Sequence, residues 1–349
     1  MSLTALARDG AVVICCGSGG VGKTTTAAAI AIEGATLGRR ACVVTIDPAR
    51  RLADALGLDA LTNNPGPVDG PWPGSLAALM LDTKTTFDDL VTRYAATPAQ
   101  AAAILANPLY RNISGALSGT QEYMAMEKLY ELQESGDFDL IVVDTPPTRN
   151  ALDFLDAPRR LTRFLDNRIF RLLVMPTRAY LKAVGFATQA FLRTVSKVVG
   201  GEVVGDAVAF FRAFEGMEEG FRQRAEHVLA LLSDPATQFV IVTSPRADAV
   251  AEAEFFVRKL AESGIGVDGV VVNRVHPSFA VGSGELEELR DTALEPFAIT
   301  AGEFNRMAAE ETQHMAGLDA QAGDVPVAHV PFLAGDVHDL AGLTGLGDF

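Results

Sequence analysis

The stretch Gly17-Ser18-Gly19-Gly20-Val21-Gly22-Lys23-Thr24 constrains this chain more than any other. It matches the phosphate-loop pattern G-x-x-x-x-G-K-[ST], follows the apolar run Ala11–Cys16 and precedes an alanine-rich segment, Thr25–Leu37, that predicts a helix. Glycines let the backbone turn tightly, so that successive N–H groups and the helix N-terminus form a cradle for phosphates. The sequence therefore predicts nucleotide binding at Gly19, Gly20, Val21, Gly22, Lys23, Thr24 and Thr25.

Seven apolar runs have the length and composition of buried strands, and most are separated by helical patterns. Unbroken apolar runs are typical of parallel strands that are covered on both faces. We predict an α/β fold, namely a P-loop NTPase with a mostly parallel, doubly wound sheet and an inserted helical subdomain. The runs are Ala11–Cys16, Ala41–Ile46, Leu76–Leu81, Leu140–Val143, Gln238–Thr243, Asp268–Val272 and Val325–Val330.

One internal segment, Ala151–Ser233, shows no strand pattern, and its apolar residues recur at helical spacing. This pattern predicts a helical insertion in the chain. We expect residues 1–93, 136–150 and 236–349 to form the P-loop ATPase core, and residues 94–135 and 151–235 to form the helical subdomain.

The composition excludes several kinds of partner and site. The net charge is −15, which argues against binding to nucleic acid or to an anionic membrane surface. No apolar run approaches the roughly 18 residues of a membrane span, so we expect a cytoplasmic protein with no direct membrane insertion. The three cysteines fall in predicted strands, and neither they nor the five histidines have metal-ligand spacing.

Two aspartates directly follow predicted strands, at the edge of the sheet where ligands of open α/β sheets collect. Asp144 fits a carboxylate that holds Mg²⁺ together with the Thr24 hydroxyl, while Lys23 reaches the β- and γ-phosphates of ATP. Asp47 fits a group that orients or deprotonates the attacking water and lies near the same ion. Helix capping or an ordinary strand end remains the alternative for either aspartate.

A family resemblance rests on the phosphate loop and three further segments, Thr45–Leu56, Asp144–Thr148 and Val271–Val275, which occur in the same order. Together they resemble the arsenite-pump and tail-anchored-protein-targeting ATPase family, and most closely its actinobacterial branch of anion-transporting ATPases, which often occur as paired subunits. The resemblance implies a SIMIBI-type fold and dimers that close over ATP and open on hydrolysis. Each such dimer is either a homodimer or a heterodimer with a paralogous ATPase.

The resemblance also implies roles for individual residues. Asp47 would lie in switch I and position the hydrolytic water, and Asp144 would begin switch II and hold the Mg²⁺ sphere. Asn273 would hydrogen-bond the adenine, and Pro331 with Phe332 would form the loop that covers the base.

The chain departs from the family pattern where positive charge is concerned. The second position of the phosphate loop, usually a lysine that reaches the nucleotide across the dimer interface, is Ser18. Arginines stand at three positions where the family has other residues, Arg50, Arg51 and Arg149. We hypothesise that one of these arginines replaces the missing charge at the γ-phosphate, and Arg149 is the first candidate. The alternative is that all three are solvated surface charges.

The leading functional hypothesis is ATP hydrolysis in a dimer whose open and closed states drive a transport or membrane-protein-targeting partner. An ATP-binding regulatory or scaffold subunit of a heterodimer, with little turnover of its own, is one alternative, and a small-molecule phosphotransferase is another. A role with arsenite is not expected, because the cysteines do not converge. Nine of the 19 phenylalanines lie between Asn150 and Pro235, which fits either a helical core or an apolar groove for a client helix.

Overall fold

The computed structural model describes residues 3–47, 49–108, 110–111, 120–146, 157, 163, 206, 209–210, 213–289, 292–337 and 339–349. The chain divides into two compact units. The first comprises Met1–Met80, Leu132–Leu152 and Asp234–Phe349, and the second comprises Leu81–Glu131 and Asp153–Ser233.

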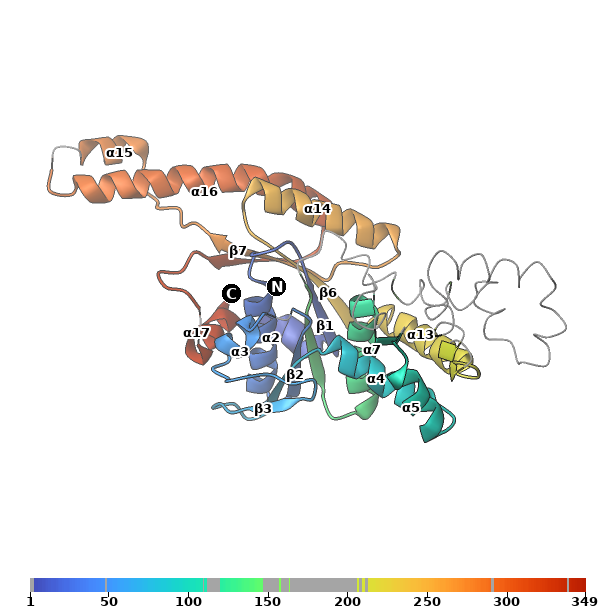
Figure 1. Ribbon diagram of the computed structural model, residues 1–349. Coiled ribbons are helices and arrows are strands. Elements are labelled where there is room, and N and C mark those ends of the chain that lie inside the picture. The colour runs from blue at the N-terminus through green and yellow to red at the C-terminus, as the bar shows by residue number, and fades with distance from the viewer. Residues whose placement is uncertain are drawn as a thin grey trace. The chain divides into compact units, whose positions relative to one another are not determined.

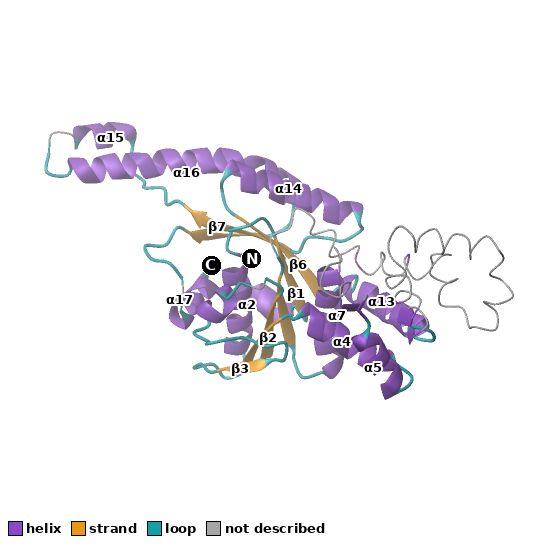
Figure 2. Ribbon diagram, in the orientation of Figure 1, coloured by secondary structure: helices purple, strands orange, loops and turns teal. Residues whose placement is uncertain are grey.

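An eight-stranded sheet forms the centre of the first unit, in the order β3-β4-β2-β5-β1-β6-β7-β8 (Figure 2). All neighbouring strands are parallel except β3 and β4, which confirms the predicted α/β fold. The strands are β1 (Val12–Cys16), β2 (Arg40–Thr45), β3 (Gly66–Val68), β4 (Ser75–Met80), β5 (Leu140–Asp144), β6 (Thr237–Thr243), β7 (Gly269–Val275) and β8 (Val327–Pro331).

The sheet is doubly wound because the chain leaves its centre in both directions. From β1 it passes through α2 (Lys23–Thr36) to β2 on one side, and from β6 through α14 (Ala247–Glu262) to β7 on the other. Right-handed crossovers in opposite directions place their helices on opposite faces. Figure 1 shows this: α2 and α17 (Leu340–Gly345) cover one face, while α14 and α16 (Glu295–Ala322) lie over the other.

Side-chain chemistry explains why the central strands and α2 form. Every residue of β1 and β5 is buried, as their unbroken apolar sequences predict. Helix α2 is rich in alanine, the strongest helix former, and its small side chains let it pack closely against β2 and β5. Cys15 and Cys16 of β1 and Cys42 of β2 are buried and form no disulfide.

Three segments of the first unit contain elements beyond the predicted strands. Residues 1–10 contain α1 (Leu3–Asp9), whose apolar face is buried and whose Leu3 N–H donates to the Phe349 carbonyl. Residues 63–75 contain the short antiparallel strand β3. Helix α16 extends over 28 residues and is preceded by α15 (Ser283–Glu288).

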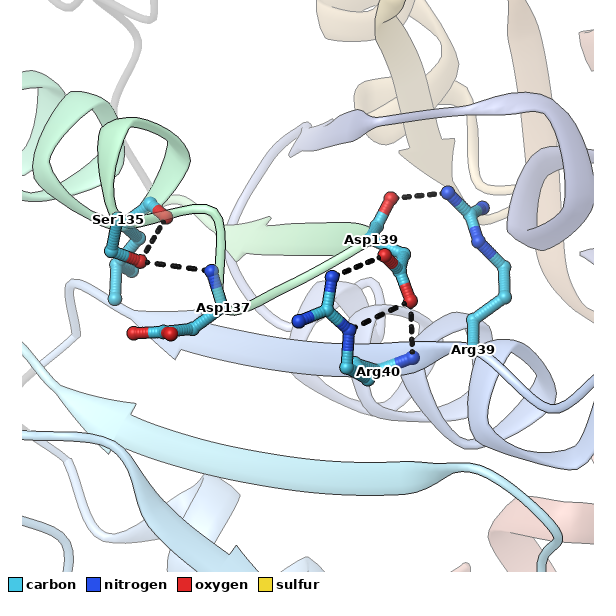
Figure 3. Close-up of polar contacts among 6 residues, drawn as sticks. Arg39, Arg40, Ser135, Asp137 and Asp139 are labelled. Carbon is cyan, nitrogen blue, oxygen red and sulfur yellow. Dashed lines mark hydrogen bonds and ion pairs between the residues drawn. The ribbon is translucent and has the colours of Figure 1, made fainter.

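Charged residues pair at the amino-terminal ends of β2 and β5 (Figure 3). Arg40, at the start of β2, makes an ion pair of 2.7 Å with Asp139, just before β5, and its backbone N–H donates to the same carboxylate. The Arg39 guanidinium donates to the Asp139 carbonyl. These contacts tie together the beginnings of two adjacent strands.

The second unit is helical where it is described. It contains α4 (Thr83–Tyr94), α5 (Pro98–Ala106), α13 (Glu218–Leu232) and most of α7 (Thr120–Ser135). Phe210, Phe214 and Phe221 are buried there and pack against one another, as a helical core requires. A buried ion pair joins Glu127 to Arg224.

Within the described ranges, no helix of the chain has both the length and the apolar character that a membrane span needs.

Candidate functional site

The phosphate loop lies at the carboxyl end of β1, between that strand and α2. Two of its glycines are required by close contacts: a Cβ on Gly17 would overlap the Val242 carbonyl of β6, and one on Gly22 would overlap the Asn273 amide of β7. Both also have positive φ, 150° and 101°, which L residues seldom adopt. The loop is therefore held against two neighbouring strands.

Helix α2 begins at Lys23 without a side-chain hydrogen bond at its cap residue, Gly22. The first N–H groups of a helix have no partner within it, so an uncapped N-terminus attracts anions. The Lys23 side chain is only 6% exposed, and its ammonium group donates to the Ser18 carbonyl at 2.7 Å. Burial lowers the pKa of Lys23, while the nearby Asp144 carboxylate opposes that shift. The lysine thus lies folded over its own loop, close to where an anion would bind.

Asp144 is the centre of a buried cluster at the end of β5. Its Oδ2 accepts from Thr24 Oγ1 at 2.7 Å and from Thr45 Oγ1 at 2.9 Å, and the residue is 1% exposed. Its Oδ1 is buried and accepts no hydrogen bond from any residue in the described parts of the chain. Burial raises the pKa of Asp144, and the two hydroxyl bonds partly oppose this.

This cluster fits a magnesium ion. The Thr24 hydroxyl and the Asp144 carboxylate, whose Oδ1 accepts from none of the described residues, are hard oxygen ligands of the kind that Mg²⁺ prefers. The ion would take its remaining ligands from water and nucleotide phosphates. Among the described residues no group of three His, Cys, Asp or Glu side chains could hold a metal by itself. Thr24 and Asp144 are thus the side chains that would hold Mg²⁺ beside a nucleotide.

Asp47 lies after β2 and lines a cavity beside the phosphate loop. Its Oδ1 accepts from the Ala49 N–H at 3.0 Å, and its Oδ2 lies 3.7 Å from the Arg51 guanidinium. A cavity of about 390 Å³ is lined by the loop and by residues that follow β2 and β5. The structure thereby brings together the predicted site residues Gly20, Gly22, Lys23, Thr24, Thr25, Asp47 and Asp144.

A second cavity, of about 300 Å³, also borders the loop. It is lined by Ser18, Gly19, Gly20 and Val21 of the loop and by residues that follow β6, β7 and β8. This is the point at which the strand order reverses, between β1 and β6, where open α/β sheets bind ligands.

The residues expected near the base lie around the end of β7. Asn273 Nδ2 donates to the Val21 carbonyl of the loop at 2.9 Å. Pro331 ends β8, and Phe332, which is 50% exposed, stacks on His276 with ring centroids 4.9 Å apart. His276 in turn is bonded through Nδ1 to Glu311 of α16 at 2.5 Å. The contact between Asn273 and the loop could not be read from the sequence.

The three arginines considered as replacements for the family's lysine have different surroundings. Arg51 pairs with Asp47 and lines the larger cavity. Arg50 donates to the Asp59 carbonyl instead. Arg149 lies outside the described residues.

Sequence reasoning assigned no role to Arg274, although it lines both cavities. Its backbone adopts a φ of 65°, which is unusual for a residue other than glycine. This conformation could not be predicted from the sequence.

Comparisons with known proteins agree with this geometry. The sequence profile described as anion-transporting ATPase matches residues 11–292. Relatives include ATPase GET3 of Malassezia globosa, 26% identical over 75% of this chain and 72% of its own, and the ATPase ASNA1 homolog of Dictyostelium discoideum, 27% identical over 74% and 70%. The ATPase ASNA1 homolog of Trypanosoma cruzi is 23% identical over 95% of this chain and 89% of its own.

Proposed function

Because the chain belongs to the anion-transporting ATPase family and is an ATPase, we propose that it works as a Mg²⁺-dependent dimer whose nucleotide-driven motion acts on a membrane-protein-targeting or transport partner. The observation that supports this most is a single cavity lined by Lys23, Thr24, Asp47 and Asp144. One buried oxygen of Asp144 accepts no hydrogen bond from the part of the chain that the structure describes. Such an arrangement suits a phosphate chain and its metal ion.

The proposed roles follow from position. The loop amides and Lys23 bind the β- and γ-phosphates, and Lys23 exchanges the Ser18 carbonyl for a phosphate oxygen. Thr24 and Asp144 hold Mg²⁺, which when bound neutralises charge on the phosphate oxygens. Asp47, fixed by Ala49 and Arg51, orients the attacking water.

The proposal includes the pairing of two subunits and a client protein or transporter. The dimer is either a homodimer or a heterodimer with a paralogous ATPase, and we propose that it works in the cytoplasm. We further propose that the helical part, residues 94–135 and 151–235, passes the motion to the partner. Asn273, Pro331 and Phe332 would contact the base.

A second candidate, an ATP-binding scaffold subunit, is favoured by Ser18, which offers no charge at the position where the family uses lysine. If the chain is an active ATPase, Arg149 supplies that charge. If it is a scaffold subunit, a different subunit provides the active nucleotide site.

Phosphate release by the purified full chain, with and without Mg²⁺, tests the proposal. Lys23→Ala should lower turnover at least about 100-fold, because the buried ammonium is lost from the phosphate site. Lys259→Ala, which removes an ammonium paired with Glu262 on α14, is the matched control and should leave turnover unchanged. The same assay on Arg149→Ala checks the proposed replacement charge.

Particle size measured with and without nucleotide checks subunit pairing. ATP-dependent doubling of the mass supports the dimer. Tight ATP binding without turnover would favour the scaffold function, and full turnover in Lys23→Ala would contradict the site itself.

A further inference from the structure

Arg274 has the one strained backbone conformation among non-glycine residues in the described part of the chain. Its φ is 65°, in the left-handed region, where an L side chain crowds its own backbone. It lies at an irregularity in the pairing of β7 with β8, where the register shifts between Asn273 and Val275. Strain of this kind persists where the surrounding structure fixes it, and it concentrates at ligand sites.

Contacts on both sides of Arg274 hold this irregularity in place. Before it, Asn273 Nδ2 donates to the Val21 carbonyl of the phosphate loop at 2.9 Å. After it, the Val275 carbonyl accepts from the Phe332 N–H at 2.8 Å. The position from which the Arg274 side chain departs is therefore fixed relative to the loop.

The exposed Arg274 side chain lines both cavities beside the phosphate loop. Gly20 is the loop residue that the two cavities share, and the space where its Cβ would be is open. A guanidinium reaching from β7 is thereby placed beside the exposed middle of the loop.

The charges in the larger cavity show why this guanidinium matters. Lys23 donates to the Ser18 carbonyl, and Arg51 pairs with Asp47. Arg274 is the third cationic side chain that lines this cavity among the described residues. The phosphates of a nucleotide that fills the cavity would bring at least two negative charges to it.

We propose that the Arg274 guanidinium binds the phosphate chain of the nucleotide where it passes the middle of the loop. A planar guanidinium donates two parallel hydrogen bonds to phosphate oxygens, which a lysine or an amide cannot reproduce. This charge comes from the same subunit and from the end of β7, so it is distinct from any arginine in the segments after β2 and β5. The inference rests on the proposed function, since it needs a nucleotide in the cavity.

Three substitutions at this position test the proposal by nucleotide affinity, measured calorimetrically with MgADP and MgATP. Arg274→Gln should weaken binding about 10- to 100-fold, because it removes a charge-assisted bidentate contact. Arg274→Lys should recover part of that loss. Arg274→Gly should bind as weakly as the glutamine variant, yet its nucleotide-free melting temperature should equal or exceed that of the wild type, because glycine adopts positive φ without strain.

Arg306→Gln is the matched control. Arg306 pairs with Glu310 on α16 and lines neither loop cavity, so its variant should bind nucleotide as the wild type does.

Wild-type affinity in Arg274→Gln, with nucleotide still bound by the unmodified chain, overturns this inference and leaves the proposed function standing. Failure of the unmodified chain to bind MgADP or MgATP overturns both. A lower melting temperature in Arg274→Gly together with unchanged affinity would assign Arg274 a purely structural role.

Discussion

The aspartates at the two ends of strand β5 differ in how their carboxylates are bonded. At the amino-terminal ends of β2 and β5, the exposed carboxylate of Asp139 is saturated by Arg40, which bonds it through both its guanidinium and its backbone N–H (Figure 3). At the carboxyl end of β5, the buried carboxylate of Asp144 keeps one oxygen without a partner among the described residues. Of these two aspartates, only Asp144 thus keeps a carboxylate oxygen that could bind a ligand.

The difference shows which charges hold the sheet together and which await a ligand. The ion pair at the amino-terminal end is exposed to solvent and satisfied within the protein, so it needs nothing further. A buried carboxylate with an open oxygen costs free energy unless a cation or a donor approaches it. Substitutions at the two ends should therefore change different measured quantities.

The largest effect is expected at Asp144. Asp144→Asn should lower turnover at least about 100-fold, because an amide replaces the carboxylate that would hold Mg²⁺. The nucleotide-free melting temperature should stay equal or rise, because the variant buries no charge and its amide oxygen, placed where Asp144 has Oδ2, still accepts from Thr24 and Thr45. Turnover assays and thermal unfolding of the same preparation check this.

A matched substitution at the other end, Asp139→Asn, should leave turnover within twofold of the wild type. If Asp144→Asn lowered the melting temperature and spared turnover, Asp144 would be a structural carboxylate like Asp139, and the contrast between the two ends would fail.

A smaller effect is expected at Asn273, which ties β7 to the phosphate loop. Asn273→Ala should weaken ATP binding about tenfold, because the loop loses its hydrogen bond at the Val21 carbonyl. Asn305→Ala, which removes a half-buried amide that accepts from the Phe279 N–H, is the control. An equal loss of GTP binding would assign the effect to the loop contact, and a loss confined to ATP would assign it to the proposed contact of Asn273 with adenine.

The smallest effect is expected at the amino-terminal edge, and it depends on pH. The hydrogen bond from Arg40 lowers the pKa of Asp139 from 3.8 to about 2. A depressed carboxylate pKa stabilises the folded state above the unfolded value, and this contribution is lost as the pH falls from about 4 toward 2. Arg40→Ala should lower the melting temperature by about 1–2 °C at neutral pH, with the difference shrinking below pH 4.

Melting curves at low ionic strength between pH 3 and pH 7 measure this difference, and added salt should reduce it further. A difference that grew on acidification would contradict the assignment of the depressed pKa to Arg40.

Much of the fold could be predicted because its signals are local. Apolar runs identified β1, β2 and β5, and the alanine-rich segment identified α2, which ends just before Gly38, a residue with φ at 85°. Helix α1 was not predicted, because seven residues of mixed character become helical by packing Leu3 and Leu6 against the core. Strand β3 was not predicted either, because three residues acquire their conformation only by pairing with β4.

The candidate site divides in the same way. Lys23, Thr24, Asp47 and Asp144 could be selected from their positions after predicted strands. The hydroxyl of Thr45 was not anticipated as a partner of Asp144, because that contact depends on the register in which β2 pairs with β5. No motif contains the register of two strands that lie about 100 residues apart in the chain.

The sequence by itself determined the phosphate loop, the buried strands and the family, because each is written in contiguous residues whose spacing decides their backbone or their chemistry. Only the tertiary structure decided that Asn273 holds the loop and that Arg274 adopts a strained conformation between two cavities. Those features arise where β7 pairs with β8 and where the phosphate loop contacts Asn273 from a distant part of the chain, and long-range packing fixes them at a cost in local backbone energy.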